Sequence, residues 1–233
     1  MVDIWRRGRL NQEDQLFRKA IPHNDDLERH LGSAVARHLP GRRLELLELG
    51  CGTGFATAAL LRRRTALDVT AVDHDASSLA QARLNLRRWK GAVRFAKADV
   101  LAFLARRPAA SADVVAAKFT LHNLERAHRA KVLRQIHRVL RPGGLFVNAD
   151  KYALEGRAHV AQVRAQMARY LDLFLPLGRR DLLREALDHT LHDEDPARLM
   201  KERDAVRDMR RLGFRGVRRV FRGGMDAVFV ATR

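Results

Sequence analysis

The sequence has little cysteine and no long apolar segment. Cys51 is the single cysteine among 233 residues, which excludes an internal disulfide and any zinc cluster of several cysteines, and favours a reducing compartment. No run reaches the ~20 apolar residues of a membrane-spanning helix, and the first ten residues, MVDIWRRGRL, lack the apolar stretch of a signal peptide. We therefore expect a soluble, cytoplasmic protein, with a length and a 46% hydrophobic fraction that suit one domain.

Acidic residues are also few. The 27 Asp and Glu residues stand against 45 Lys and Arg, which gives a net charge of +18. Most of the basic residues are arginines, and they are spread over almost every predicted helix instead of forming one tract. Such a charge is typical of proteins that bind nucleic acid, but its dispersion equally indicates a basic, solvated surface. Nucleic acid is therefore a second-choice partner on charge alone.

The most informative segment is 44–58, LELLELGCGTGFATA. Its apolar first part predicts a buried strand over 44–49, and the residues from Phe55 to Leu61 favour a helix. Gly50, Gly52 and Gly54 lie between them and allow backbone angles that a side chain would forbid. Free N–H groups at a helix N-terminus attract electron-rich ligand groups. The segment therefore predicts a loop that binds a nucleotide-like cofactor.

Two common phosphate-binding patterns are absent from this loop. The dinucleotide pattern Gly-x-Gly-x-x-Gly, begun at Gly50, would need Gly or Ala where Phe55 stands. The P-loop pattern fails because no Gly-Lys-Ser/Thr follows. A pyrophosphate is therefore a poor fit, and a tight turn without any ligand remains an alternative at this point.

Strands and helices alternate through the middle of the chain. Further strands are predicted over 67–72, 92–96, 112–117 and 145–149, with helices between them, so we expect a doubly wound, mostly parallel sheet of the α/β class. The last two predicted strands, 216–221 and 226–231, are joined so closely that they must be antiparallel. The sequence Arg141-Pro142-Gly143-Gly144 should end the helix before the fifth strand.

The remaining segments divide the single domain into four parts. These are an N-terminal helical extension (1–41), a cofactor-binding core (42–152), a helical insert (153–196), and a C-terminal helix with two strands (197–233). Helices are predicted over 11–20 and 24–38, with Asn24 as the N-cap of the second. An apolar stripe from Val160 to Phe174 indicates core packing in the insert more than a wall of the substrate site.

Five features in order resemble class I S-adenosylmethionine-dependent methyltransferases. They are the acidic-x-Gly-x-Gly-x-Gly loop from Glu48, Asp73 at the end of the second strand, Asp99 at the end of the third, the segment 118–124, and a helix closed by LRPGG. The resemblance covers roughly 44–149, and the strand pair after Leu-Gly-Phe is similar to the last two strands of that family. It implies a Rossmann-like, seven-stranded sheet with an antiparallel last strand, and S-adenosyl-L-methionine as the cofactor.

The resemblance also implies a set of cofactor-binding residues. Glu48 would orient the loop and the cofactor's amino group, Asp73 would accept hydrogen bonds from both ribose hydroxyls, and Asp99 would accept from the adenine amine. Capping of the following helix is the alternative for each Asp. The full set is Glu48, Gly50, Cys51, Gly52, Gly54, Asp73, His74, Asp99, Val100, Lys118 and Phe119.

The segment 118–124, KFTLHNL, should face the reactive methyl group. It lacks the Asn/Asp-Pro-Pro-aromatic tetrapeptide of enzymes that methylate adenine or glutamine, and is similar to the version in small-molecule methyltransferases. His122 is the candidate catalytic residue, either as a general base or as a hydrogen-bond donor that orients the acceptor. A structural role, in which His122 caps the next helix, is the alternative.

Other clusters carry weaker signals. The run 189–196, HTLHDEDP, holds His189, His192, Asp193, Glu194 and Asp195, but adjacent acidic residues before Pro more often begin a helix, with Asp195 as N-cap and Pro196 at the first position. We therefore predict no metal. Second-rank pocket candidates are Asp150, Lys151 and Tyr152. Trp5, Phe17 and His23 could form a lid, although simple packing is favoured.

The leading prediction is a methyltransferase that acts on an O or N atom of a small molecule. An RNA methyltransferase, with tRNA as the target, is the alternative that the charge supports. A non-catalytic protein that binds S-adenosylmethionine is the third reading, because fold alone does not establish activity. The sequence fixes neither the methyl acceptor nor the oligomeric state.

Overall fold

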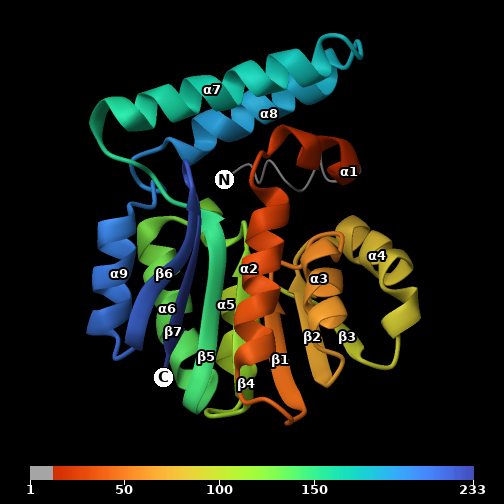
Figure 1. Ribbon diagram of the computed structural model, residues 1–233, viewed down its shortest axis with the longest axis vertical. Coiled ribbons are helices and arrows are strands. Elements are labelled where there is room, and N and C mark those ends of the chain that lie inside the picture. Colours follow the sequence, from red (N-terminus) through yellow and green to blue (C-terminus); the bar gives the residue numbers. More distant parts are fainter. Residues whose placement is uncertain (1–12) are drawn as a thin grey trace.

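The computed structural model describes residues 13–233, and its centre is one seven-stranded sheet in the order β3-β2-β1-β4-β5-β7-β6 (Figure 1). β1 to β5 are parallel, and β7 runs antiparallel to both of its neighbours. The predicted doubly wound fold with an antiparallel last strand is therefore confirmed. The strands are β1 (Leu44–Leu49), β2 (Leu67–Asp73), β3 (Val93–Lys97), β4 (Ala112–Lys118), β5 (Leu140–Lys151), β6 (Arg215–Gly223) and β7 (Asp226–Thr232).

Helices cover both faces of the sheet. Side chains alternate across a strand, so Leu46 of β1 packs with the cluster under α2, α3 and α4, while Leu47 packs with the cluster under α5, α6 and α9. The helices are α1 (Asp14–Phe17), α2 (Asn24–Arg37), α3 (Phe55–Arg63), α4 (Ala76–Asn85), α5 (Val100–Arg106), α6 (Arg126–Val139), α7 (Gly156–Phe174), α8 (Arg180–Asp193) and α9 (Glu202–Arg211), with 3₁₀ turns η1 (Arg18–Ala20), η2 (Arg87–Trp89) and η3 (Leu121–Asn123).

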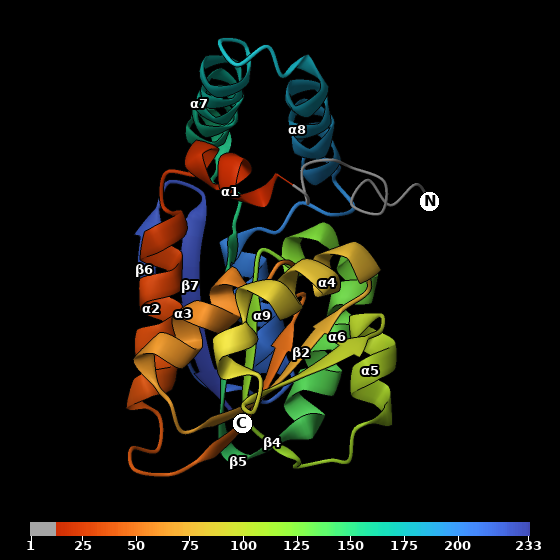
Figure 2. The same ribbon diagram turned by 90° about the vertical axis from the view of Figure 1, so that its right-hand side faces the viewer.

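The insert forms a separate layer beyond the carboxyl ends of the parallel strands. Figures 1 and 2 show α7 and α8 above the sheet, with α1 beneath them. Tyr170 and Phe174 are buried in a third cluster with Phe17, as the predicted packing stripe requires. Val160 and Leu171 of the same stripe are 49% and 41% exposed, so only part of the stripe is buried. None of the helices from residue 13 onward is long and apolar enough to span a membrane.

Two local predictions were wrong, and one strand starts earlier than predicted. Asn24 is the first residue of α2 and does not cap it, because its side chain instead accepts a hydrogen bond from Lys118. Asp195 caps a turn at Ala197, and the last helix begins only at Glu202. The predicted helix stop is confirmed, because α6 ends at Val139, but β5 starts at Leu140 instead of Leu145. The RPGG segment lies inside β5 because Gly143 and Gly144 exchange backbone hydrogen bonds with Arg233.

Candidate functional site

A cavity of about 540 Å³ lies at the carboxyl ends of β1, β2, β4 and β5. Open α/β sheets bind ligands at this edge, and 540 Å³ is a usual size for a small-molecule site. The glycine loop and the ends of β2 and β4 form its floor, whereas α1, α7 and α8 provide its other walls. The cavity thus joins segments from the extension, the core and the insert.

The glycine loop has the backbone conformation that its sequence predicts. Gly50, Gly52 and Gly54 have φ angles of 65°, 52° and 86°, in the left-handed region that disfavours other residues. A Cβ at Gly50 would collide with Thr120, whereas one at Gly52 would meet nothing within 4 Å. The backbone of Gly52 therefore borders open space in the cavity. A ligand could approach the backbone closely at this position.

Asp73 fixes this loop from the end of β2. Its Oδ2 accepts a hydrogen bond from the Gly52 N–H at 2.8 Å, and its Oδ1 accepts from the Asp75 N–H at 2.9 Å. Asp73 is 7% exposed and lines the cavity together with His74. Each carboxylate oxygen keeps a second lone pair for a ligand.

Asp99 and Val100 line the same end of the cavity, at the start of α5. Asp99 Oδ1 accepts from the N–H groups of Leu101 and Ala102, so this residue is a helix cap, as the alternative reading held. Cys51 also lines the cavity, and burial raises the pKa of its thiol, which keeps it neutral.

Glu48 lies behind the loop and outside the cavity. Its side chain is 1% exposed and accepts a hydrogen bond from the Thr57 hydroxyl. Burial raises the pKa of Glu48 to about 7, against the opposing effect of that hydrogen bond. Neither Glu48 nor Gly54 is among the residues that line the cavity.

The raised pKa of Glu48 makes stability depend on pH. In the unfolded chain Glu48 ionises near 4.5, but in the folded protein it ionises only near 7, so folding becomes less favourable as pH rises from about 4.5 to 7 and then levels off. We expect Glu48→Gln to remove this contribution and to stabilise the protein at pH 8 by about 3 kcal/mol. Urea unfolding of both proteins at pH 5 and pH 8 measures the difference. Equal pH dependence in the two would contradict the assignment.

A buried ionic network anchors the N-terminal helices to the end of β4. Lys118 Nζ donates to Asn24 Oδ1 at 2.6 Å and to Glu28 Oε1 at 2.7 Å, and Arg18 pairs with the same Glu28. Burial favours neutral Glu28, but Arg18 and Lys118 together lower the pKa of its carboxyl. Lys118 and Phe119, predicted as cofactor residues, both line the cavity. Nothing in the sequence indicated that Asn24 and Glu28 would contact Lys118, or that Arg18 would pair with Glu28.

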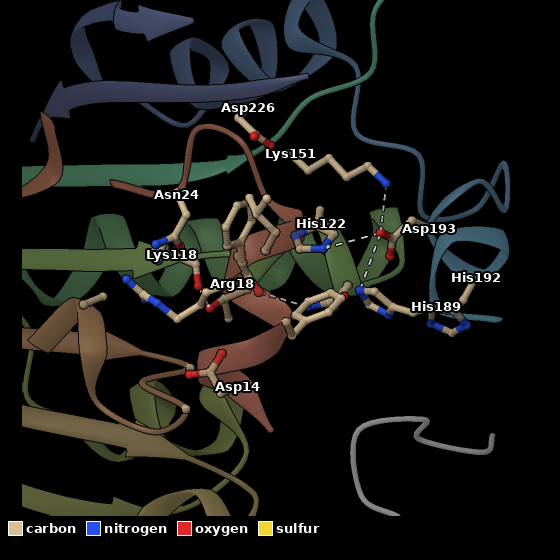
Figure 3. A pocket seen from close by; sticks show the side chains of 18 of the residues that line it. Asp14, Arg18, Asn24, Lys118, His122, Lys151, His189, His192, Asp193 and Asp226 are labelled. Atoms are coloured by element: carbon tan, nitrogen blue, oxygen red, sulfur yellow. Dashed lines mark hydrogen bonds and ion pairs between the residues drawn. The ribbon is translucent and has the colours of Figure 1, made fainter. Parts of the chain in front are cut away.

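His122 is buried at the other end of the cavity. Its Nδ1 lies 2.5 Å from Asp150 Oδ1, and the second oxygen of Asp150 accepts from the Leu121 N–H. His122 Nε2 lies 3.7 Å from Asp193 Oδ2 (Figure 3). Burial lowers the pKa of His122, but the charges of Asp150 and Asp193 outweigh burial and raise it. The N-cap of α6 is Glu125, so His122 does not cap that helix.

The insert brings further polar side chains to His122. His189, His192 and Asp193 of α8 line the cavity, and Lys151 at the end of β5 pairs with Asp193 at 3.1 Å (Figure 3). Asp226 at the start of β7 also lines the cavity, and burial raises the pKa of its carboxyl to about 6. Sequence reasoning missed Asp226, because a single carboxylate next to a hairpin turn gives little signal.

Of the weaker candidates from the sequence, some line the cavity and others do not. Tyr152 is buried away from the cavity, where its hydroxyl accepts from the Asn148 side chain. Phe17 and His23 do line the cavity. Trp5 lies outside the described residues. Glu194 and Asp195 of the acidic run turn to other partners, with Glu194 2.6 Å from His159.

The comparisons with known proteins agree on one kind of domain. Residues 46–144 match a family model described as a methyltransferase domain. The chain is 29% identical to carboxy-S-adenosyl-L-methionine synthase of Aeromonas hydrophila, over 60% of this chain and 56% of that protein. It is 34% identical to demethylmenaquinone methyltransferase of Leptospira interrogans, over 52% of this chain and 48% of that protein. The chain thus spans about half the length of these curated relatives.

Solved structures share the fold. One is 1,6-didemethyltoxoflavin-N1-methyltransferase of Burkholderia thailandensis with bound 1,6-didemethyltoxoflavin and S-adenosylhomocysteine, at a TM-score of 0.59 and 22% identity over 89% of this chain and 78% of that one. Another is an O-methyltransferase family protein from the same organism, at a TM-score of 0.64 and 18% identity over 97% of this chain and 63% of that one. At these identities the likeness is one of fold.

A doubly wound sheet with a glycine loop after its first strand and a carboxylate at the end of its second defines an α/β domain that binds a nucleotide-like cofactor. The family match and the shared fold narrow the kind: residues 46–144 match a methyltransferase domain, and the chain has the fold of solved methyltransferases. Both findings agree with the resemblance in the sequence.

Proposed function

We propose that this protein transfers the methyl group of S-adenosylmethionine to an O or N atom of a small molecule. The observation that carries the proposal is the division of the cavity into two ends. Gly52, Asp73 and Asp99 line it beyond β1, β2 and β3, and His122 lines it beyond β4, on the other side of β1 in the sheet order. A cofactor held at the first end would present its methyl group toward the second.

The residues at the first end suit this cofactor. The open space beside Gly52 leaves room for a ligand against the backbone, and the remaining lone pairs of Asp73 suit two ribose hydroxyls. Asp99 caps α5 through Oδ1 alone. Among the hydrogen bonds of the described residues none involves Asp99 Oδ2, so this oxygen could accept from the adenine amine. When bound, the cofactor supplies a methyl group already activated by the positive sulfonium.

The chain's own tasks are then alignment and exclusion of water. His122, held through Nδ1 by Asp150, is positioned to orient the acceptor with its other ring nitrogen. The extension and the insert cover the cavity from two sides, with Phe17 and Tyr170 in its lining. Such a cover favours a small acceptor over a long polymer.

Two binding and transfer measurements test the proposal. We expect S-adenosylhomocysteine to bind with micromolar affinity in calorimetry, and labelled S-adenosylmethionine to transfer its methyl group to a compound in a metabolite extract. Parallel incubations with total RNA and with protein separate the alternatives. Transfer to RNA alone would favour the tRNA-methyltransferase reading, and cofactor binding without transfer to any fraction would favour a non-catalytic protein. Well-folded protein that binds neither ligand would contradict all three.

A second candidate follows from the curated relatives. Several of them are carboxy-S-adenosyl-L-methionine synthases, at 24–29% identity. In this reading the cofactor itself would be the molecule modified. Mass spectrometry of the cofactor after incubation with the extract distinguishes the two, because methyl transfer yields S-adenosylhomocysteine, whereas the synthase reaction yields a carboxylated S-adenosylmethionine.

A further inference from the structure

Three metal-ligating side chains meet at the acceptor end of the cavity. His122 comes from η3, and His189 and Asp193 come from α8. The two Nε2 atoms lie 3.7 Å and 3.6 Å from the same oxygen, Asp193 Oδ2, and the three ligand atoms all lie within 4.8 Å of one another (Figure 3). All three residues are buried. Methyl transfer as proposed above gives His189 and Asp193 no task.

We propose that His122, His189 and Asp193 form a binding site for a divalent first-row transition metal ion, with Zn²⁺ as the reference ion. Two imidazole nitrogens and one carboxylate are a donor set that suits zinc and non-haem iron. Ca²⁺ and Mg²⁺ prefer ligand sets made of oxygen alone, so they suit this site poorly.

The distances between the ligands are close to those of a zinc site. Tetrahedral ligands with bonds of about 2.0–2.2 Å lie about 3.3 Å from one another. The two N···O separations exceed this value by only a few tenths of an ångström. His189 and Asp193 are four residues apart on α8 and therefore share one face of the helix. A small approach of α8 to η3 would complete the triangle.

The surroundings of the ligands support the assignment independently. His122 presents Nε2 because its Nδ1 is held by Asp150, and a carboxylate behind a histidine ligand is the usual way to fix the ring on a metal. Asp193 Oδ1 is buried and has no hydrogen-bond partner among residues 13–233. A buried carboxylate oxygen without a partner is costly, and the charge of an ion bound at Asp193 would offset this cost.

Lys151 is the competitor of the ion. Its ammonium lies 3.1 Å from Asp193 Oδ2 and supplies positive charge at the oxygen that faces both imidazoles. Glu194 Oε1 lies 3.9 Å from the same ammonium and offers an alternative partner. The ion would therefore have to displace Lys151 toward Glu194. This competition predicts that removal of the lysine charge tightens metal binding.

Metal binding would have two consequences. It would tie the insert to the segment after β4, which raises the thermal stability of the whole chain. With three protein ligands, a fourth position is left for a water molecule or an acceptor oxygen, as in catalytic zinc sites. His122 would then contact the acceptor through the ion instead of by its own N–H. The inference does not depend on the proposed function, because metal binding needs no methyl donor.

Calorimetric titration of the metal-free full chain with Zn²⁺ tests the site, with absorption by Co²⁺ in the visible range as a report on tetrahedral coordination. We expect one ion per chain, a rise in melting temperature, and a loss of affinity of at least about 100-fold in His189→Ala and in Asp193→Asn. Lys151→Gln should bind more tightly than the wild type. His128→Ala is the matched control, because His128 lines the same cavity from α6 but is not one of the three ligands.

Several results would overturn the proposal. Wild-type protein that binds neither Zn²⁺ nor Co²⁺ at millimolar concentration excludes the site. Unchanged binding in both His189→Ala and Asp193→Asn places the ion elsewhere. Asp193→Asn keeps the size of the side chain and remains informative if His189→Ala fails to fold. Weaker binding by Lys151→Gln contradicts the location of the ion at Asp193. None of these results affects the binding of S-adenosylhomocysteine, which tests the proposed function separately.

Discussion

Replacement of Asp73 by Ala should weaken the binding of S-adenosylhomocysteine by about 1,000-fold, equivalent to about 4 kcal/mol. The variant loses the carboxylate proposed to accept from two ribose hydroxyls, each a charge-assisted hydrogen bond of about 1.5–3 kcal/mol. It also loses the bond that fixes the Gly52 N–H in the loop. Calorimetric titration of both proteins measures the change.

The matched control for this prediction lies on the same strand. Asp68 also belongs to β2, but at its other end, where it pairs with the exposed Arg43. Asp68→Ala should therefore leave the affinity for S-adenosylhomocysteine unchanged. Asp73→Asn keeps the size of the side chain but removes its charge and one of its two acceptor oxygens. A loss of affinity in this variant would therefore be due to the carboxylate and not to the space that it fills. An Asp73→Ala protein that binds as tightly as the wild type would refute the assigned role.

Replacement of Glu28 by Leu should destabilise the protein by about 3–5 kcal/mol, because it leaves the buried ammonium of Lys118 without its carboxylate. The side chains of both residues are 9% exposed. Burial lowers the pKa of Lys118, and Glu28 counteracts that effect. Urea unfolding measures the loss. Arg18 loses the same partner, so the contact between η1 and α2 at the edge of the cavity should also become less stable.

A second substitution distinguishes a lost ion pair from general damage. Lys118→Met in the Glu28→Leu background removes the more buried of the two charges that lost their partner, and should recover much of the lost stability. Glu45→Gln is the surface control, since Glu45 pairs with the 64% exposed Arg94, and should cost less than about 1 kcal/mol. A Glu28→Leu protein as stable as the Glu45→Gln protein would show that the network contributes little.

The glycine loop and its place in the fold could be predicted because the features of this segment are local. A run of leucines followed by three alternating glycines specifies a strand, a turn and a helix within fifteen residues, and no distant contact is needed to recognise them. Asp73 and Asp99 were equally accessible to sequence reasoning. Each follows a predicted strand, and the carboxyl ends of parallel strands share one edge of the sheet.

Element boundaries were less predictable where distant residues decide them. The RPGG segment has the composition of a helix stop and a turn, but pairing with Arg233 draws it into β5. Asn24 has the chemistry of a helix cap, but the ammonium of Lys118, 94 residues later, makes a hydrogen bond to its side chain. In both cases a partner far along the chain outcompetes the local preference.

By itself, the sequence determined the order of strands and helices and the glycine loop, because both depend on hydrophobic period and on turn residues that act over a few positions. The class of cofactor was implied only by the family resemblance. Only the tertiary structure decided the polar cluster around His122. His122, Asp150 and Asp193 come from three elements, and the path of the insert alone brings α8 over η3. Side-chain contacts between such distant segments follow from packing in three dimensions, which no spacing along the chain encodes.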